Sequence, residues 1–218
     1  MVHSREQHTG ESAHVRRIEH DIIVSWIEPG ATILDLGCGD GTLLRRLHRE
    51  RGTTGCGIEI DEEQVCRAVE QGVSVLHGDI DSGLPDYADR SFAYVILNQS
   101  LQQVRHVETV LNEALRVGRR VIVGFPNFAY LPARLQLFFG GRVPVTGSLP
   151  YAWYDTPNLH FLSIKDFVAY CRSRNIHVER AAYTAGNRRI RLLPNLRADS
   201  GLFMLTRSAE ERGHGSLV

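Results

Sequence analysis

Short apolar runs rich in β-branched residues alternate along the chain with stretches whose apolar positions recur every three or four residues. Runs of the first kind predict buried strands, and the second spacing predicts amphipathic helices. The predicted strands lie at residues 32–36, 55–60, 73–77, 92–97, 120–125, 176–183 and 201–206. The predicted helices lie at 15–27 and 42–51, from 61 onward, around 107–115, and at 163–174.

This alternation, with strands that are apolar on both faces, is typical of a parallel sheet covered by helices. We therefore expect a Rossmann-like α/β fold with a seven-stranded, mostly parallel sheet and helices on both faces. The last two strands are expected to form an antiparallel edge pair. Five prolines and three glycines interrupt residues 126–160, so a loop insertion at about 126–162 is expected within a single domain spanning 14–207.

Three local signals predict where helices begin and end. Gly52 is a stop signal for the helix at 42–51. Asp61 is expected to cap the next helix, with Gln64 reaching back to complete a capping box. Ser163 with Asp166 has the same spacing and predicts the start of the helix that runs to about residue 174.

The composition excludes several classes of protein. With 43% apolar and 23% charged residues, the chain is neither disordered nor fibrous. The 25 basic and 25 acidic residues cancel, so the general basic field of a nucleic-acid binder is absent and nucleic acid is not an expected partner. The charges are nevertheless separated: residues 1–103 hold nine basic and seventeen acidic side chains, and residues 104–218 hold sixteen and eight.

The distribution of cysteines and apolar residues indicates the compartment. Four cysteines occur, with no Cys-x-x-Cys pair and no metal-binding His/Cys spacing, so reduced thiols and no metal site are expected. No run of apolar residues is long enough for a signal peptide or a membrane span. A soluble, cytoplasmic protein without membrane contact is expected, with flexible tails at 1–13 and 208–218.

A glycine-rich turn follows the first predicted strand and opens the next helix. Gly37, Gly39 and Gly41 permit a tight turn and a close approach of the backbone to a ligand, and Cys38 lies between the first two. Asp35 stands two residues before the first glycine. Its carboxylate would repel a pyrophosphate and attract an ammonium or sulfonium group, or else accept hydrogen bonds from the loop amides.

Polar residues also end the next strands. Glu59 closes the second strand, where an acidic side chain can bind both hydroxyls of a ribose. Asp79 closes the third, in a position to accept from the exocyclic amine of adenine, and Asn98 follows the fourth. With their neighbours Ile60 and Ile80, they complete the set of expected ligand-binding residues.

This arrangement of glycines and acidic residues resembles the cofactor motifs of class I S-adenosylmethionine-dependent methyltransferases. The resemblance implies that the ligand is S-adenosylmethionine or S-adenosylhomocysteine. Two positions depart from the usual pattern. Ala93 replaces an Asp near the start of the fourth strand, and the turn before the fifth strand is shortened to residues 117–119.

A narrower resemblance rests on longer strings, at residues 78–81, 95–102, 125–128, 141–146 and 149–160. They are similar to the corresponding stretches of the MetW family of methionine biosynthesis proteins. That resemblance implies a methyltransferase-fold subunit that associates with a homoserine O-acyltransferase and supports its acyl transfer. No methyl acceptor is clearly established in that family. The alternative is an active methyltransferase that acts on a small molecule.

The sequence does not identify a catalytic residue. It lacks the Asn-Pro-Pro-Tyr motif of amino-methylating enzymes and the Pro-Cys nucleophile of cytosine methylases. Candidate bases are His106, His160, Asp155 and Tyr151, all on predicted loops. A surface or packing role is the more ordinary explanation for each, so both catalytic activity and catalytic residues stay unassigned.

Two segments of the second half are candidates for binding the partner. Aromatic residues gather at 151–161 behind an apolar run at 131–139, which is consistent with a loop packed over the sheet, a substrate lid or a docking surface. Arginines form a late cluster at positions 180, 188, 189, 191 and 197. A solvated face is the ordinary explanation for that cluster, and contact with an acidic partner or an acyl-coenzyme phosphate is the functional one.

Overall fold

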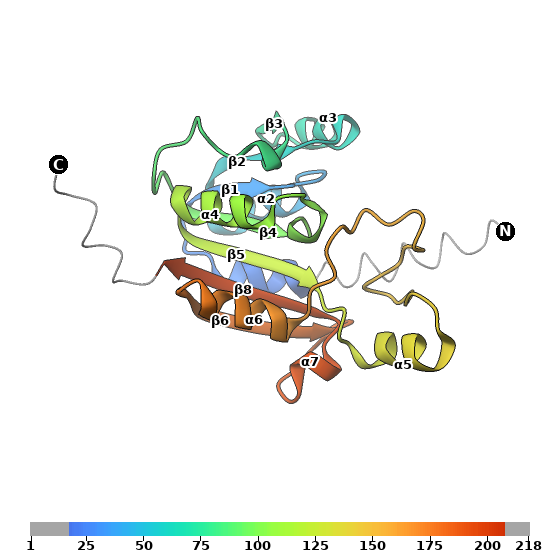
Figure 1. Ribbon diagram of the computed structural model, residues 1–218. Coiled ribbons are helices and arrows are strands. Elements are labelled where there is room, and N and C mark those ends of the chain that lie inside the picture. The colour runs from blue at the N-terminus through green and yellow to red at the C-terminus, as the bar shows by residue number, and fades with distance from the viewer. Residues whose placement is uncertain (1–17, 208–218) are drawn as a thin grey trace.

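The computed structural model describes residues 18–207. The predicted tails at 1–13 and 208–218 lie outside the described residues. One eight-stranded sheet runs through the molecule in the order β3-β2-β1-β4-β5-β8-β6-β7 (Figure 1). The strands are β1 (Thr32–Leu36), β2 (Thr54–Glu59), β3 (Val75–His77), β4 (Phe92–Asn98), β5 (Gly118–Pro126), β6 (Ile176–Ala185), β7 (Arg188–Arg189) and β8 (Ser200–Arg207).

Strands β1 to β5 pair in parallel, and β8 pairs antiparallel with both β5 and β6. The expected α/β fold with a mostly parallel sheet is therefore confirmed. One detail of the prediction was wrong. The described residues form eight strands rather than seven, because residues 188–189 form a two-residue strand beside the end of β6. The expected antiparallel pair of late strands is confirmed: β6 and β8 pair antiparallel at one end of the sheet, where only the short β7 lies beyond them.

Helices or short 3-10 turns follow the parallel strands. The helices and turns are α2 (Thr42–Arg51), α3 (Glu62–Glu70), η1 (Ile80–Ser82), η2 (Leu101–Gln103), α4 (Val107–Val117), α5 (Leu131–Gly140), α6 (Ile164–Ser173) and α7 (Pro194–Arg197). The alternation ends after β5, where α5 and α6 follow one another. A further helix covers residues 18–26 of the described chain. Helix α2 has the predicted bounds, and Gly52 follows it at a φ of 61°, as expected of a glycine stop.

The start of α3 differs from the predicted capping box. Asp61 accepts hydrogen bonds from the backbone N–H groups of Glu63 and Gln64, as expected. The backbone N–H of Asp61, however, donates to the carboxylate of Glu59 at 3.0 Å and not to Gln64. Asp61 therefore caps α3 with its side chain, while its own N–H is bonded to the last residue of β2. At α6 the prediction is confirmed, because the Ser163 side chain accepts from the N–H of Asp166.

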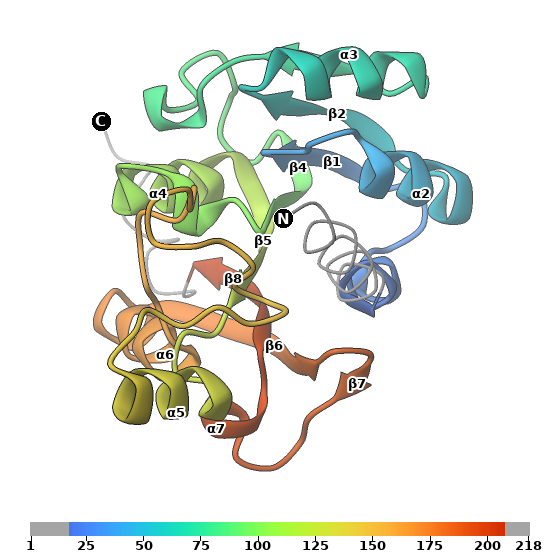
Figure 2. The same cartoon turned by 90° about the vertical axis from the view of Figure 1, so that its right-hand side faces the viewer.

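Both faces of the sheet are buried. Successive side chains of each strand point to opposite faces, so one strand contributes to a core cluster on each side. In β4, Val95 and Leu97 join the cluster beneath α4 and α6, and Tyr94 and Ile96 join the cluster beneath α2 and the helix at 18–26. Figure 2 shows these two layers of helices on either side of the sheet. The carboxyl ends of the parallel strands are thereby held in one rigid row.

Candidate functional site

The predicted ligand-binding residues meet at the carboxyl ends of the parallel strands. Asp35 of β1 lies opposite Gly57 of β2 and Ile96 of β4. Glu59 is the last residue of β2, and Asn98 is the last of β4. Because neighbouring parallel strands end at the same edge, these side chains line one rim of the sheet.

Glu59 is the residue that fixes the shape of this rim. Its side chain is only 9% exposed. One carboxylate oxygen accepts from the N–H of Gly39 at 2.8 Å, and the other accepts from the N–H groups of Ile60 and Asp61 at 2.8 and 3.0 Å. The carboxylate thus ties the glycine-rich turn to the start of α3. Carboxylate oxygens carry further lone pairs, which leaves capacity for hydroxyl donors.

The glycines of the turn have different roles. Gly37 has a φ of 76°, and a Cβ there would lie 2.7 Å from the Cβ of Ser100. Gly37 is therefore required for packing of the turn against the segment after β4. Gly39, at a φ of 55°, would have no atom within 4 Å of its Cβ. The turn is open at Gly39, so this is the point where a ligand can approach the backbone.

Asp35 is a buried acid with a perturbed pKa. Its side chain is 3% exposed. Burial, followed by the charge of Glu59, raises its pKa from 3.8 to about 7. The loop amides do not donate to it, because those of Gly37 and Cys38 donate to the carbonyl of Ile58 and that of Gly39 donates to Glu59. The role of accepting hydrogen bonds from the loop amides, considered from sequence, is therefore not seen for Asp35.

The side chain of Cys38 packs against the neighbouring strand β2. Its thiol is packed so closely against β2 that a Cβ on Gly57 would lie 2.3 Å from the sulfur. Burial, together with the charges of Asp35 and Glu59, raises the pKa of this thiol well above its ordinary value. The thiol is therefore neutral and unreactive at physiological pH, and its main contribution is to hold the turn against β2.

The outer part of the rim carries the residues expected at an adenine. Asp79 is exposed, and it accepts from the N–H of Asp81 at 2.9 Å through one oxygen. Ile60 is 61% exposed, which leaves an apolar side chain beside the ribose-binding position. Ile80 is half-buried and packs on the core. One acidic oxygen and two apolar side chains thus stand together at this end.

A row of buried polar atoms begins at the end of β4; Asn98 and His160 were named from the sequence, whereas Ser100 and Gln102 were not. Within residues 18–207, the Oδ1 of Asn98, the Oγ of Ser100 and the Oε1 of Gln102 are buried without a hydrogen-bond partner, and so is the Nε2 of His160. A Cβ on Gly124 would lie 2.2 Å from the Asn98 oxygen, so the glycine leaves room for that side chain. Buried polar atoms without partners are uncommon, and here they indicate a ligand or ordered water.

A second polar cluster was also missed, because it joins residues distant in sequence. Glu19 is fully buried, and both of its oxygens accept from the side-chain amide of Gln99, at 3.0 and 3.1 Å. Ser200 donates to Glu19 and lies 3.1 Å from the carbonyl of Phe125. Gln99 itself has a φ of 62°, which is unusual outside glycine and is held in place by this network.

The candidate bases do not converge. His106 is exposed at the start of α4, with its Nδ1 3.5 Å from the Asp81 carboxylate. Asp155 and Tyr151 are exposed on the inserted loop. His160 is the one whose ring nitrogen is buried beside the segment after β4. A catalytic residue therefore stays unassigned.

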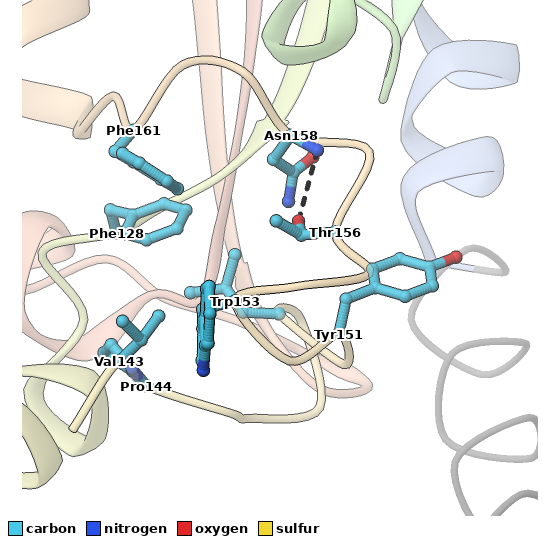
Figure 3. Close-up of a pocket in the computed structure, with 9 residues that line it drawn as sticks. Phe128, Val143, Pro144, Tyr151, Trp153, Thr156, Asn158 and Phe161 are labelled. Carbon is cyan, nitrogen blue, oxygen red and sulfur yellow. Dashed lines mark hydrogen bonds between the residues drawn. The ribbon is translucent and has the colours of Figure 1, made fainter.

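The inserted loop reaches the same rim through its last residues. The backbone N–H groups of Leu159 and His160 both donate to the carbonyl of Gln102, at 2.9 and 3.0 Å. Farther out, Trp153 is 72% exposed, so part of the aromatic segment is not packed over the sheet. Figure 3 shows the hollow that this loop forms; it is lined by Phe128, Val143, Pro144, Leu149, Tyr151, Trp153, Thr156, Asn158 and Phe161.

Residues 18–207 show neither a metal-binding cluster nor a membrane-spanning helix. No three His, Cys, Asp or Glu side chains are grouped so that they could hold a metal ion. No helix in that part of the chain is both long and apolar enough to cross a membrane.

The fold and its rim define a class of protein, that of the class I S-adenosylmethionine-dependent methyltransferase fold. A methyltransferase from Thermotoga maritima, described as a possible histamine N-methyltransferase, superposes with a TM-score of 0.65 at 18% identity, covering 95% of this chain and 96% of its own. Magnesium protoporphyrin IX methyltransferase from Synechocystis, solved with bound S-adenosylhomocysteine, gives 0.62 at 18% identity, with 90% and 86% covered.

The family can be stated more narrowly. The model of the family "Methionine biosynthesis protein MetW" matches residues 17–205. The bifunctional methionine biosynthesis protein MetXA/MetW of Rhodopirellula baltica is 34% identical over 203 residues, which cover 87% of this chain. The chain belongs to the MetW family of methionine biosynthesis proteins. It spans about one third (33%) of the length of that bifunctional relative.

Proposed function

We propose that the protein binds S-adenosylmethionine or S-adenosylhomocysteine at the rim of the sheet, and that it associates with a homoserine O-acyltransferase in the cytoplasm and activates it. The observation that carries the ligand part is the position of Glu59, buried at the end of β2 and bonded to the amide of Gly39. The partner part is supported by the bifunctional relative, in which a MetW unit is joined to MetXA in one chain.

The residues present fit an adenosyl ligand. Glu59 would accept the ribose hydroxyls, Asp79 has one carboxylate oxygen left for the adenine amine, and Ile60 with Ile80 would contact the ring. The remaining rim oxygens are acceptors, which matches a ligand rich in N–H and O–H donors. The backbone at Gly39 is open on the side where such a ligand would lie.

The amino-acid end of the ligand fits the inner part of the rim. Asp35 is buried and receives no hydrogen bond from the loop, and the Asn98 oxygen is buried without a partner among the described residues. An ammonium group beside them would satisfy both the charge and the acceptor, and a sulfonium would satisfy the charge alone. When bound, S-adenosylmethionine supplies an activated methyl group, and S-adenosylhomocysteine supplies none.

The proposal assigns the protein a binding role because no catalytic residue is assigned at the rim. A regulatory subunit needs a ligand site and a docking surface but no base. The direct test measures acyl transfer by the homoserine O-acyltransferase with and without this protein, at saturating and zero S-adenosylmethionine. Stimulation together with co-purification supports the proposal, and an unchanged rate without co-purification contradicts it.

A second candidate is an active methyltransferase with a small-molecule acceptor. It is favoured by the nearness of His160 to the rim, since its Nε2 is buried without a partner and its N–H donates to Gln102. Incubation with methyl-labelled S-adenosylmethionine and a panel of amine, thiol and hydroxyl acceptors separates the two. Labelled product that is lost in His160→Ala but retained in the exposed control His106→Ala would establish catalysis.

A further inference from the structure

The second half of the chain presents apolar side chains that the fold does not cover. In α5, Phe138 is 81% exposed, and its neighbours Leu137 and Phe139 are exposed as well. Trp153 and Tyr154 of the inserted loop are exposed in the same way. Residues 126–162 carry only two arginines and one aspartate among all these apolar groups. Apolar patches of this kind commonly mark sites where another protein binds.

The loop and α5 form one surface because the side chain of Gln136 joins them. Its amide donates to the carbonyl of Val145 at 3.1 Å, and its oxygen accepts from the N–H of the same residue at 2.9 Å. The loop then folds back so that Phe161 contacts Phe128, with ring centroids 4.5 Å apart (Figure 3). Trp153 lies beside that pair and lines the same hollow.

Helix α7, which carries Arg197 of the late arginine cluster, adjoins this apolar surface, although the two are separated in sequence. Asn127, fully buried after β5, donates to the carbonyls of Asn195 and Ala198 in and after α7. Its oxygen accepts from the N–H groups of Ala129 and Ile164. These four bonds fix the segment before α5 to α7 and to the start of α6. Arg134 of α5 also donates to the carbonyl of Asn195 at 3.3 Å, so α5 and α7 lie side by side (Figure 2).

The segment from β7 to α7 is basic, and its arginines form no ion pairs among the described residues. Among the described residues, Arg188, Arg189, Arg191 and Arg197 form no ion pair, and residues 186–197 contain no acid. Leu193 stands between them, exposed and at a φ of 52°. A leucine rarely adopts that backbone conformation, and such local strain tends to occur at functional positions.

We propose that these segments are one docking surface for the acyltransferase, and we call it the α5–α7 surface: the exposed apolar residues of α5 and of the loop at 151–161, bordered by the four arginines. It fits a partner face with apolar side chains at its centre and carboxylates along one side. This inference rests on the proposed function, and it joins the two alternative partner sites of the sequence analysis into a single one.

The charges favour a different protein over a second copy of this chain. In a twofold dimer the same patch faces itself, so each basic border would have to meet acids of the other copy's patch. The patch offers only Asp155. Arginines rather than lysines form the border, which suits bidentate pairing with carboxylates of a protein. The preformed hollow around Trp153 likewise suits an apolar side chain better than a lipid surface.

The experiment measures the dissociation constant between the full chain and the purified homoserine O-acyltransferase by biolayer interferometry. The variants are Phe138→Ala, Trp153→Ala and the pair Arg188→Glu with Arg189→Glu. Each changes exposed side chains, so thermal melting should be unchanged. Matched controls are Val69→Ala on α3 and Arg45→Glu on α2, both exposed and both distant in the fold.

We expect the dissociation constant to rise at least tenfold for each apolar variant and for the charge reversal, and to stay within twofold for the controls. Added salt should weaken the wild-type complex more than the charge-reversed one. Wild-type binding that none of the variants changes would overturn the surface and leave the proposed function standing. No wild-type binding at all would overturn the proposed function itself. Self-association that depends on Phe138, or sedimentation with anionic phosphatidylserine vesicles in place of partner binding, would also overturn the assignment.

Discussion

Replacement of Asp35 by asparagine should stabilise the ligand-free protein and weaken its hold on a cationic ligand. Burial and the charge of Glu59 raise the pKa of Asp35 from 3.8 to about 7. The folded state therefore binds this proton more tightly than the unfolded state, and the free energy of unfolding falls as the pH rises from about 4 to 7. Above pH 7 the cost is fully present, at about 4 kcal/mol, because each pKa unit corresponds to about 1.4 kcal/mol.

Asparagine keeps the shape of the side chain and removes its charge, so Asp35→Asn should recover this cost. Linkage gives a gain of about 4 kcal/mol at pH 8, or roughly 8–16 °C in Tm, and only about 1.5 kcal/mol at pH 5. Circular dichroism melts between pH 5 and 8.5 measure the gain, with the exposed Asp86→Asn as control. Calorimetric titration with S-adenosylmethionine should show binding about 10- to 100-fold weaker, since a charged hydrogen bond is lost. A gain in Tm that does not depend on pH, or a loss at pH 8, would refute this account of Asp35.

Three further predictions test other parts of the structure. Glu59→Gln replaces an acceptor of three backbone N–H groups, so calorimetry should show at least tenfold weaker ligand binding, with about 1–3 kcal/mol lost in urea unfolding. Gly37→Ala places a Cβ 2.7 Å from that of Ser100 at a positive φ, and a fall in Tm with weaker ligand binding is expected. Asn127→Ala removes four hydrogen bonds from a buried site, so urea unfolding should show a loss of about 3 kcal/mol; a loss below about 1 kcal/mol would mean that water replaces the side chain.

Elements whose signals lie within one segment could be predicted closely from the sequence. The bounds of α2 follow from its apolar spacing and from Gly52, both of which are local. The same holds for Asp61 and Ser163 as caps, since each bonds to residues two or three positions away. One cap partner was predicted wrongly: the N–H of Asp61 donates to Glu59, two residues earlier. The position of that carboxylate depends on its long-range bond to Gly39 of the glycine-rich turn, which no local pattern shows.

Long-range pairing could be predicted only in part. The antiparallel pairing of the late strands β6 and β8 was expected, but no local pattern shows that β8 also pairs with β5 or that residues 188–189 add a short strand. The cluster of Glu19, Gln99 and Ser200 joins residues up to 181 positions apart. The rim residues, in contrast, could be located in advance, because parallel strands end at a common edge whatever their order.

The carbonyl of Gln102 lies where two regions of the molecule meet. It receives both N–H groups that anchor the end of the inserted loop, while the side-chain amide of the same residue donates to the carbonyl of Gln99, next to Asn98 at the rim. A ligand that tightens this short turn changes the freedom of the loop, and a protein bound to the loop changes the turn. Thermodynamic linkage makes any such effect mutual: a tenfold gain in affinity at one site is a tenfold gain at the other. The peptide group of Gln102 would then couple the binding of an adenosyl metabolite to the assembly of a protein complex.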